Sequence, residues 1–238
     1  MDRLSPRNGL ALPGIALIIP AYNEAPAIGA VLRAVPEGAV DTVIVVDNAS
    51  SDGTGEIARA HGARVVREDR PGYGNACRAG LEASQGYDVL VFLDGDRSDE
   101  PSDLPRVLAP ILQGRAELVL GSRLRGTLEA GALPGHQRAG NRVATILIRL
   151  LYGVRLSDIG SFRAIRREHL LALEMNHPTY GWPVEMVVKA ARRRYRIVEV
   201  PITYHARIGV SKVGGTVGGS VRAGRAMLGA IWRYSRDG

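Results

Sequence analysis

The chain has 238 residues, 45% of them hydrophobic, which allows one large domain or two small ones, with one the better expectation. Its net charge of +7 divides into −6 over residues 1–122 and +13 over residues 123–238, so a half that could hold a metal ion adjoins a half that could hold phosphates or an anionic surface. Nucleic acid is an alternative partner for the basic half, but this half lacks the interleaved aromatic residues and motifs of nucleic-acid readers, which argues against that partner class. The single Cys77 excludes an internal disulfide.

The first half of the chain predicts strands that alternate with helices. After a tail over residues 1–13, short runs rich in β-branched residues indicate buried parallel strands over 15–19, 42–46, 63–66 and 89–93. Apolar residues at three-to-four spacing predict helices between them, over 25–34, 53–61 and 75–84. This alternation is typical of a single α/β domain with a mostly parallel central sheet flanked by helices, in which ligands bind beyond the carboxyl ends of the strands.

The second half predicts further elements of both kinds. The glycine-rich stretch 125–137 favours a mobile loop. Pro201 favours an edge position for the last strand, because proline cannot donate to a ladder. The apolar patterns predict helices over 102–113 and 141–152 and strands over 117–120 and 196–205.

Two carboxylates directly follow the fourth predicted strand. Asp94 and Asp96 flank Gly95 there, where an unpaired charge would be costly. Hard oxygen ligands at such a position suit a divalent cation that keeps several waters and takes its other ligands from phosphates. The implied partner is a nucleoside diphosphate, although acidic pairs of this kind also occur in solvated turns.

Seven short blocks share their residues and their order with a known family. They are Ile-Ile-Pro-Ala-Tyr-Asn-Glu at 18–24, Val-Val-Asp-Asn-Ala-Ser-Ser-Asp-Gly-Thr at 45–54 and Leu-Asp-Gly-Asp at 93–96, followed by 121–123, 158–164, 181–186 and 207–212. The first three resemble the signatures of family 2 glycosyltransferases with a GT-A fold. The later four resemble the polyprenyl-phosphate sugar synthases, the branch that includes dolichyl-phosphate mannose synthase. The resemblance implies a GT-A catalytic domain over residues 14–212.

The resemblance implies a donor site at the carboxyl edge of the sheet. Asp94 and Asp96 would hold Mg²⁺ or Mn²⁺ on the diphosphate of a UDP- or GDP-sugar, where the metal stabilises the leaving group. Some relatives supply a Gln where this chain has Ser98, so water or Asp99 could complete the ligand shell. The candidate donor-binding residues are Pro20, Tyr22, Glu24, Asp47, Asp52, Asn75, Asp94, Gly95, Arg207 and Lys212.

Local chemistry offers alternatives for several of these residues. Asp47 could cap the helix that follows instead of binding the ribose or base. Asp52 fits ordinary turn chemistry equally well. Asn75 closes a loop whose glycines could let backbone N–H groups approach the nucleotide or could simply form a turn. Many relatives carry a Lys where Tyr73 stands, which puts a charged contact at that place in doubt.

The resemblance also implies an acceptor site in the second half. Asp158 is a candidate acid or base, and its role depends on the acceptor, because an ionised phosphate needs no strong base whereas an alcohol does. Its structural alternative is an N-cap or a salt bridge. Asp96 and Arg123 are the other catalytic candidates, since a guanidinium matches phosphate geometry. The candidate acceptor-binding residues are Arg123, Arg138, Arg142, Trp182 and Glu185, for which solvated surface or core are the alternatives.

These features together predict a metal-dependent, inverting glycosyltransferase that moves a sugar from UDP or GDP to a polyprenyl phosphate such as dolichyl or undecaprenyl phosphate. A glycosyltransferase with a soluble acceptor would share the donor half. A non-catalytic nucleotide-sugar-binding subunit would tolerate loss of Asp94 and Asp96. A nucleotidyltransferase would use a glycine-rich basic loop, which is absent near Ile19.

The C-terminal segment 213–238 predicts a basic amphipathic helix that packs on the domain or lies at an anionic membrane surface. No uncharged apolar stretch reaches the roughly 18 residues needed to span a bilayer. The first residues are too polar for a signal peptide. We therefore expect a cytoplasmic protein that could contact the inner face of the membrane. The sugar, the base, the choice between Mg²⁺ and Mn²⁺ and the oligomeric state stay open.

Overall fold

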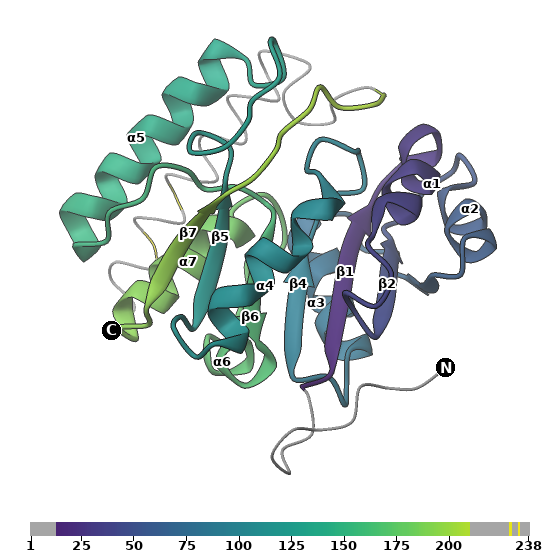
Figure 1. The fold of residues 1–238 in the computed structure, drawn as a ribbon, viewed down its shortest axis with the longest axis horizontal. Coiled ribbons are helices and arrows are strands. Elements are labelled where there is room, and N and C mark those ends of the chain that lie inside the picture. The colour runs from purple at the N-terminus through teal and green to yellow at the C-terminus, as the bar shows by residue number, and fades with distance from the viewer. Residues whose placement is uncertain (1–12, 210–228, 230–232, 234–238) are drawn as a thin grey trace.

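A seven-stranded sheet forms the centre of the protein (Figure 1). The computed structural model describes residues 13–209 together with Gly229 and Arg233. The strand order is β3-β2-β1-β4-β6-β5-β7; β6 runs antiparallel to both of its neighbours, and every other neighbouring pair is parallel. The strands are β1 (Ile15–Ala21), β2 (Thr42–Asp47), β3 (Arg64–Arg67), β4 (Val89–Phe92), β5 (Leu118–Ser122), β6 (Arg163–Arg166) and β7 (Ile197–Pro201).

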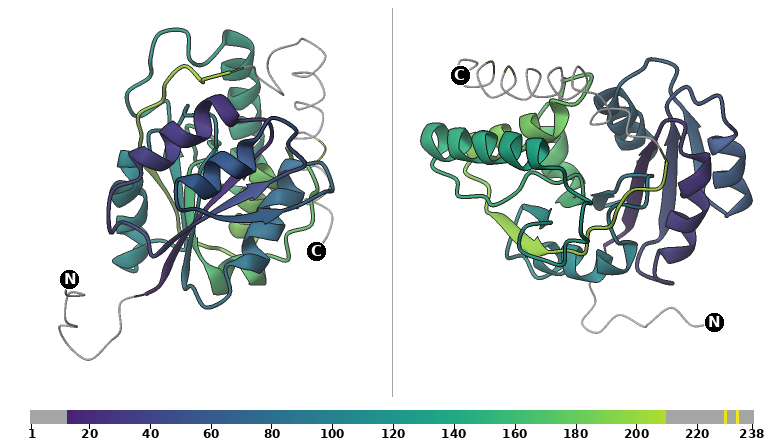
Figure 2. Two further views of the ribbon diagram at one scale, coloured as in Figure 1. Left: turned by 90° about the vertical axis from the view of Figure 1, so that its right-hand side faces the viewer. Right: turned by 90° about the horizontal axis from the view of Figure 1, so that it is seen from above.

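Helices cover both faces of this sheet (Figure 2). The apolar residues of α1, α2 and α4 pack on one face, and those of α3, α5, α6 and α7 pack on the other. No helix in this part of the chain is both long and apolar enough to cross a membrane. The helices are α1 (Ala25–Ala34), α2 (Thr54–Ala60), α3 (Tyr73–Ala83), the 3₁₀ turn η1 (Pro101–Asp103), α4 (Leu104–Leu112), α5 (Gly135–Tyr152), α6 (Arg167–Ala172) and α7 (Trp182–Arg192).

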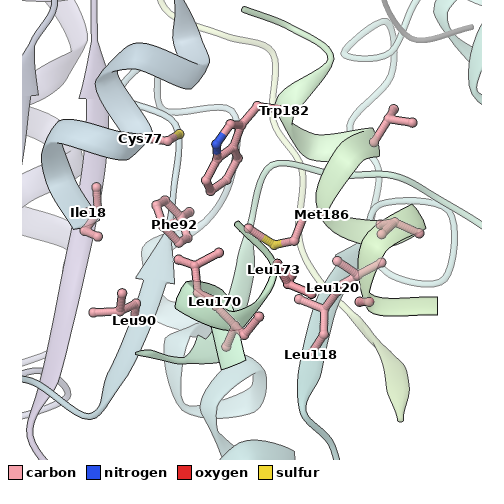
Figure 3. Packing of buried hydrophobic residues seen from close by; sticks show 14 of the residues in the cluster. Ile18, Cys77, Leu90, Phe92, Leu118, Leu120, Leu170, Leu173, Trp182 and Met186 are labelled. Carbon is pink, nitrogen blue, oxygen red and sulfur yellow. The ribbon is translucent and has the colours of Figure 1, made fainter. Parts of the chain in front are cut away.

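The buried strands supply side chains to both layers alternately, as the two-residue period of a strand requires. In β1, Leu17 joins the cluster under α1 and α4, whereas Ile18 joins the cluster under α3 and α7. Trp182 closes the second cluster, with its ring centroid 5.1 Å from that of Phe92 (Figure 3). A strand buried on both faces therefore appears in the sequence as a continuous apolar run.

The predicted fold class is confirmed, and the early strands and helices occur close to their predicted bounds. The prediction that Pro201 marks an edge is also confirmed, because β7 is the last strand of the sheet. The predicted loop 125–137 was wrong at its end, because α5 begins at Gly135. Pro134 can start a helix. The glycines that follow it are poor helix formers, so the sequence did not indicate the first turns of α5. The predicted helix over 213–234 lies outside the described residues, apart from Gly229 and Arg233, as does most of the tail over 1–13.

Three elements were not predicted: β6, α6 and α7. The residues of β6, Arg-Ala-Ile-Arg, carry too short an apolar pattern to indicate a strand. The antiparallel direction of β6 matters for function, because it brings the loop that precedes the strand to the same edge of the sheet as the carboxyl ends of β1, β2, β4 and β5. Asp158 and Ser161 are part of that loop.

Candidate active site

A cavity of about 720 Å³ lies at the carboxyl edge of the sheet. Its wall combines the ends of β1 and β4 with Arg123 after β5, the first turns of α5 and the segment after β7. Of the predicted site residues, the structure brings eight to this wall: Pro20, Tyr22, Glu24, Asp94, Gly95, Asp96, Arg123 and Arg207. The cavity is therefore where residues from the two halves of the chain meet.

Asp94 presents an unsatisfied oxygen in this cavity. Its Oδ1 is buried and accepts no hydrogen bond, a situation that is costly for a carboxylate. Burial and the nearby charge of Asp96 raise the pKa of Asp94 to about 6, although the hydroxyls of Ser161 and Tyr73 oppose that rise. An orphaned carboxylate oxygen of this kind is the group that a bound cation would satisfy.

Asp96 is oriented by its own loop. Its Oδ1 accepts hydrogen bonds from the backbone nitrogen of Ser98 at 2.9 Å and from the Ser98 hydroxyl at 2.6 Å. Its Oδ2 lies 3.4 Å from Nη2 of Arg207. Ser98 therefore positions Asp96, and the structure assigns this role to the residue that stands where some relatives carry a glutamine.

The donor set of Asp94 and Asp96 fits a divalent cation of the Mg²⁺ or Mn²⁺ type. Both residues offer hard carboxylate oxygens, and one of these oxygens lacks a partner. In the described part of the chain, no cluster of three or more His, Cys, Asp or Glu residues is arranged to hold a metal. An ion held by Asp94 and Asp96 would take its remaining ligands from water and phosphate.

Asp99 is a third carboxylate near this pair. It is fully buried, and its Oδ2 accepts a hydrogen bond from the Ser161 hydroxyl at 2.9 Å while Oδ1 has no partner. Burial and then the charge of Asp94 raise the pKa of Asp99 to about 8. Asp99 is not on the cavity wall, so the expectation that it could complete a metal shell is unsupported. Its role is to link the β4 loop to the loop before β6.

The segment after β7 crosses the β4 loop and delivers Arg207. The backbone nitrogen of Ile208 donates to the carbonyl of Asp96 at 2.9 Å, and that of His205 donates to Ser98 at 2.8 Å. These bonds place Nη2 of Arg207 3.0 Å from Oε1 of Glu24. The Nε of Arg207 is buried without a hydrogen-bond partner. A guanidinium held in this way has a donor left for an anion in the cavity.

Arg123 and Asp158 form an ion pair on the other side of the cavity. The Nε of Arg123 lies 2.7 Å from Oδ2 of Asp158, and Nη2 lies 2.6 Å from Oδ1. Asp158 is fully buried, and its side chain raises the pKa of Arg123 further above its ordinary value despite the opposing effect of burial. The guanidinium also lies over the ring of Tyr204, 5.2 Å from its centroid. Arg123 faces the cavity and Asp158 holds it there from behind.

Further hydrogen bonds fix the loop that carries Asp158. Glu199 of β7 accepts from the backbone nitrogens of Ser157 and Asp158, each at 2.9 Å to Oε1. Asn141 of α5 accepts from the backbone nitrogen of Ile159 at 3.0 Å. Two elements, β7 and α5, therefore hold the loop that carries Asp158.

Two predicted donor residues, Asp47 and Asp52, lie off the cavity wall and are engaged in local structure. Asp47 accepts from the Ser50 nitrogen and pairs with Arg67 at 2.9 Å. Asp52 accepts from Thr54 and from the Ala25 nitrogen; burial opposes these hydrogen bonds, but together they lower its pKa. The contacts of Asp52 match its turn alternative. Asp47 does not cap α2, because the N-cap residue of that helix is Gly53 and no side chain caps it.

Asn75, a third predicted donor residue, also lies off the cavity wall. Its side chain donates to the carbonyl of Pro71 at 3.0 Å, and its backbone nitrogen donates to the carbonyl of Pro178 at 3.0 Å. It therefore ties the start of α3 to the segment before α7. Lys212 lies outside the described residues, so its donor role stays a prediction.

The other acceptor candidates are not brought to the cavity. Trp182 is in the core (Figure 3), and Glu185 is fully buried, where it accepts from the backbone nitrogens of Asn176 and His177. Both residues belong to an unpredicted helix, whose inward face they occupy. Arg138 and Arg142 are exposed on α5.

Sequence reasoning missed several wall residues, among them Tyr73, His136, Ser161 and Tyr204. The signal for Ser161 was present, because it belongs to one of the matching blocks. Tyr73 was noted only as a departure from relatives. No local pattern marks His136 or Tyr204, which reach the cavity through the start of α5 and the segment after β7.

Comparison with known proteins gives a consistent result. A sequence model described as glycosyl transferase family 2 matches residues 16–173. The chain is 37% identical over 215 residues to an uncharacterized glycosyltransferase of Mycobacterium tuberculosis, covering 90% of this chain and 96% of that protein. It is 36% identical over 241 residues to the undecaprenyl-phosphate mannosyltransferase of Micrococcus luteus, covering 93% of this chain and 97% of that protein.

A solved structure has the same architecture. Glucosyl-3-phosphoglycerate synthase from Mycobacterium tuberculosis, in complex with Mn²⁺, UDP-glucose and phosphoglyceric acid, superposes with a TM-score of 0.75. The match has 24% sequence identity and covers 97% of this chain and 86% of that one. At this identity the likeness supports the fold and not the substrates.

Proposed function

Because the chain belongs to glycosyl transferase family 2, we propose that it transfers a sugar from a UDP- or GDP-sugar to a polyprenyl phosphate, with inversion at the anomeric carbon. The single observation that carries the donor half is the orphaned Oδ1 of Asp94 beside Asp96 at the cavity wall. A divalent cation held there would neutralise charge on the diphosphate as it leaves.

Two observations support a polyprenyl phosphate as the acceptor: the name of a relative and the position of Arg123. The Micrococcus luteus relative is named for transfer to undecaprenyl phosphate, and the match spans nearly the whole of both chains. Arg123 supplies a guanidinium at the cavity wall that suits a phosphate head group. Asp158 gives both carboxylate oxygens to Arg123, which favours a positioning role for it over general-base catalysis.

The proposed reaction needs no proton transfer. An anionic oxygen of the acceptor phosphate attacks the anomeric carbon from the side opposite the diphosphate, so a new C–O bond forms as the old one breaks. The nucleoside diphosphate leaves with the electron pair of the broken bond. Arg207, which has a free Nε donor near Asp96, would stabilise the negative charge on the leaving diphosphate.

The test is release of nucleoside diphosphate from UDP-glucose and GDP-mannose with Mg²⁺ or Mn²⁺, with and without a short polyprenyl phosphate. We expect release that requires both metal and lipid phosphate. Asp96→Asn should lower it at least about 100-fold, whereas Asp69→Asn, at an exposed carboxylate away from the cavity, should not. Release with soluble alcohols or acids alone would move the acceptor to that class, and nucleotide binding without turnover would favour a binding subunit.

A further inference from the structure

Helix α5 carries an apolar stripe on its outer side that nothing in the described structure covers. Val143, Ile146 and Leu150 follow one another at three-to-four spacing, and they are 48%, 44% and 74% exposed. Leu151 beside them is 50% exposed. The inward stripe of the same helix, which includes Ala144 and Ile148, is buried in the core. The helix is therefore apolar on two faces, one of which no described residue covers.

The charges on helix α5 are of one sign. Helix α5 contains no acidic residue, and Arg138, Arg142 and Arg149 are all exposed on it. Arg155, just beyond the helix, is exposed as well. Apolar side chains that share a helix with arginines and with no acidic residue fit a surface that is both hydrophobic and negatively charged.

The stripe is continuous with the candidate active site. His136, Gln137, Gly140 and Asn141, in the first two turns of α5, line the cavity. The exposed stripe begins with Val143, directly after these residues. Figure 1 shows α5 along the outer margin of the molecule, and Figure 2 shows it from above, where it borders the sheet on one side. A molecule that lay along α5 would have its head group at the mouth of the cavity.

From these three observations we propose that the outer face of α5, formed by Val143, Ile146, Leu150 and Leu151 with Arg142 and Arg149, docks on the surface of an anionic lipid bilayer. The aliphatic side chains enter the boundary between head groups and acyl chains, and the arginines contact lipid phosphates. In combination with the proposed function, this orientation would let a polyprenyl phosphate bring its head group to Arg123 while its tail stays in the membrane.

The binding test uses the full-length protein and vesicles without donor or acceptor. We expect the protein to float with vesicles of mixed phosphatidylcholine and phosphatidylglycerol and to be released by high salt. The double variant Ile146→Asp, Leu150→Asp should bind at least about tenfold less. Leu171→Asp is the matched control, since Leu171 is 51% exposed on α6, a separate helix that lies below α5 in the view of Figure 1, and it should bind as the wild type does.

A milder variant separates charge from folding effects. Arg149→Gln changes one exposed side chain for which the described structure gives no ion pair. It should weaken binding to anionic vesicles about fivefold and leave binding to neutral vesicles unchanged, because one arginine near an anionic surface contributes about that factor. Equal binding of wild type, Ile146→Asp/Leu150→Asp and Arg149→Gln would overturn the proposal.

Two other occupants give different outcomes. If the face joins two copies of this chain, light scattering would find a wild-type dimer and a monomeric Ile146→Asp/Leu150→Asp variant. If another segment of the chain covers it, that variant would lose thermal stability while the wild type fails to bind vesicles. Either result would overturn membrane docking.

Activity then distinguishes this inference from the proposed function. Ile146→Asp/Leu150→Asp should keep turnover with a short, water-dispersed polyprenyl phosphate and lose turnover with a long-chain acceptor embedded in vesicles. Vesicle binding that depends on α5, with no transfer to either acceptor, would refute the lipid acceptor and leave the docking surface intact.

Discussion

Arg123 and Asp158, 35 residues apart, form a bidentate ion pair in which the carboxylate is fully shielded from solvent. The backbone nitrogen of Arg123 also donates to Oδ2 of Asp158 at 2.9 Å. The pair joins the loop after β5 to the loop before β6 and so fixes one wall of the cavity. Because this ion pair fixes the orientation of the Arg123 guanidinium, the side chain need not lose conformational freedom when an anion binds.

Breaking this pair should destabilise the fold as well as lower activity. Asp158→Asn leaves a largely buried Arg123 without its counter-charge, so we expect the free energy of unfolding to fall by about 3–5 kcal/mol in urea titrations. In the double variant Arg123→Met, Asp158→Leu, much of that stability should return while turnover stays lost. A double variant that regained turnover would show that neither residue acts in the reaction.

In the metal-free protein, Asp94 should lower the free energy of unfolding. Replacing it by Asn removes a buried charge with an orphaned oxygen, so Asp94→Asn should unfold at a higher denaturant concentration than the wild type when EDTA is present. The same variant should lose Mn²⁺-dependent binding of UDP or GDP in calorimetry. Asp69→Asn serves as the control for an exposed carboxylate, and unchanged nucleotide binding by Asp94→Asn would rule out the proposed metal site.

Stability of the metal-free protein should depend on pH through Asp99. Its folded-state pKa is raised to about 8 by burial, so the folded protein holds a proton that the unfolded chain releases near pH 4. The contribution of Asp99 to the free energy of unfolding is therefore fully present below about pH 4. It is lost as pH rises toward 8, by an amount on the order of a few kcal/mol. The pKa of Asp94 is raised as well, so its ionisation also lowers the free energy of unfolding as pH rises.

The measurement is the urea midpoint in EDTA at several pH values between 4 and 9. Asp99→Asn should flatten the decline, because the neutral side chain has no proton to lose. Added Mn²⁺ should offset part of the decline in the wild type by binding to ionised Asp94 and Asp96. A midpoint that rises with pH in EDTA would contradict the assignment.

Gly74 should tolerate no side chain. A Cβ there would overlap the carbonyl oxygen of His177, so Gly74→Ala must push the start of α3 away from the segment that leads into α7. We expect a loss of about 1–3 kcal/mol of stability and weaker donor binding, since the neighbouring Tyr73 lines the cavity. Gly135→Ala is the control, because no atom lies within 4 Å of its Cβ position, and it should be neutral or slightly stabilising in thermal unfolding.

The sequence by itself determined the fold class, the early strands and helices, and the position of Asp94 and Asp96 at the end of β4. These features depend on neighbours in the chain, because apolar periodicity and turn chemistry act over a few residues. The resemblance of ordered blocks added the family, and the comparisons bear it out. Pro201 marked an edge strand for an equally local reason, the missing N–H.

Tertiary structure alone decided which polar residues face the cavity. Asp47, Asp52 and Glu185 looked like site residues, yet their carboxylates satisfy backbone N–H groups or pair with neighbouring cations. The sequence did not reveal that β6 runs antiparallel and carries the Asp158 loop to the cavity edge, or that α5 turns an apolar stripe outward. The physical reason is that strand direction and the burial of each helix face are set by contacts between residues far apart in the chain, which leave no periodic signal in any one segment.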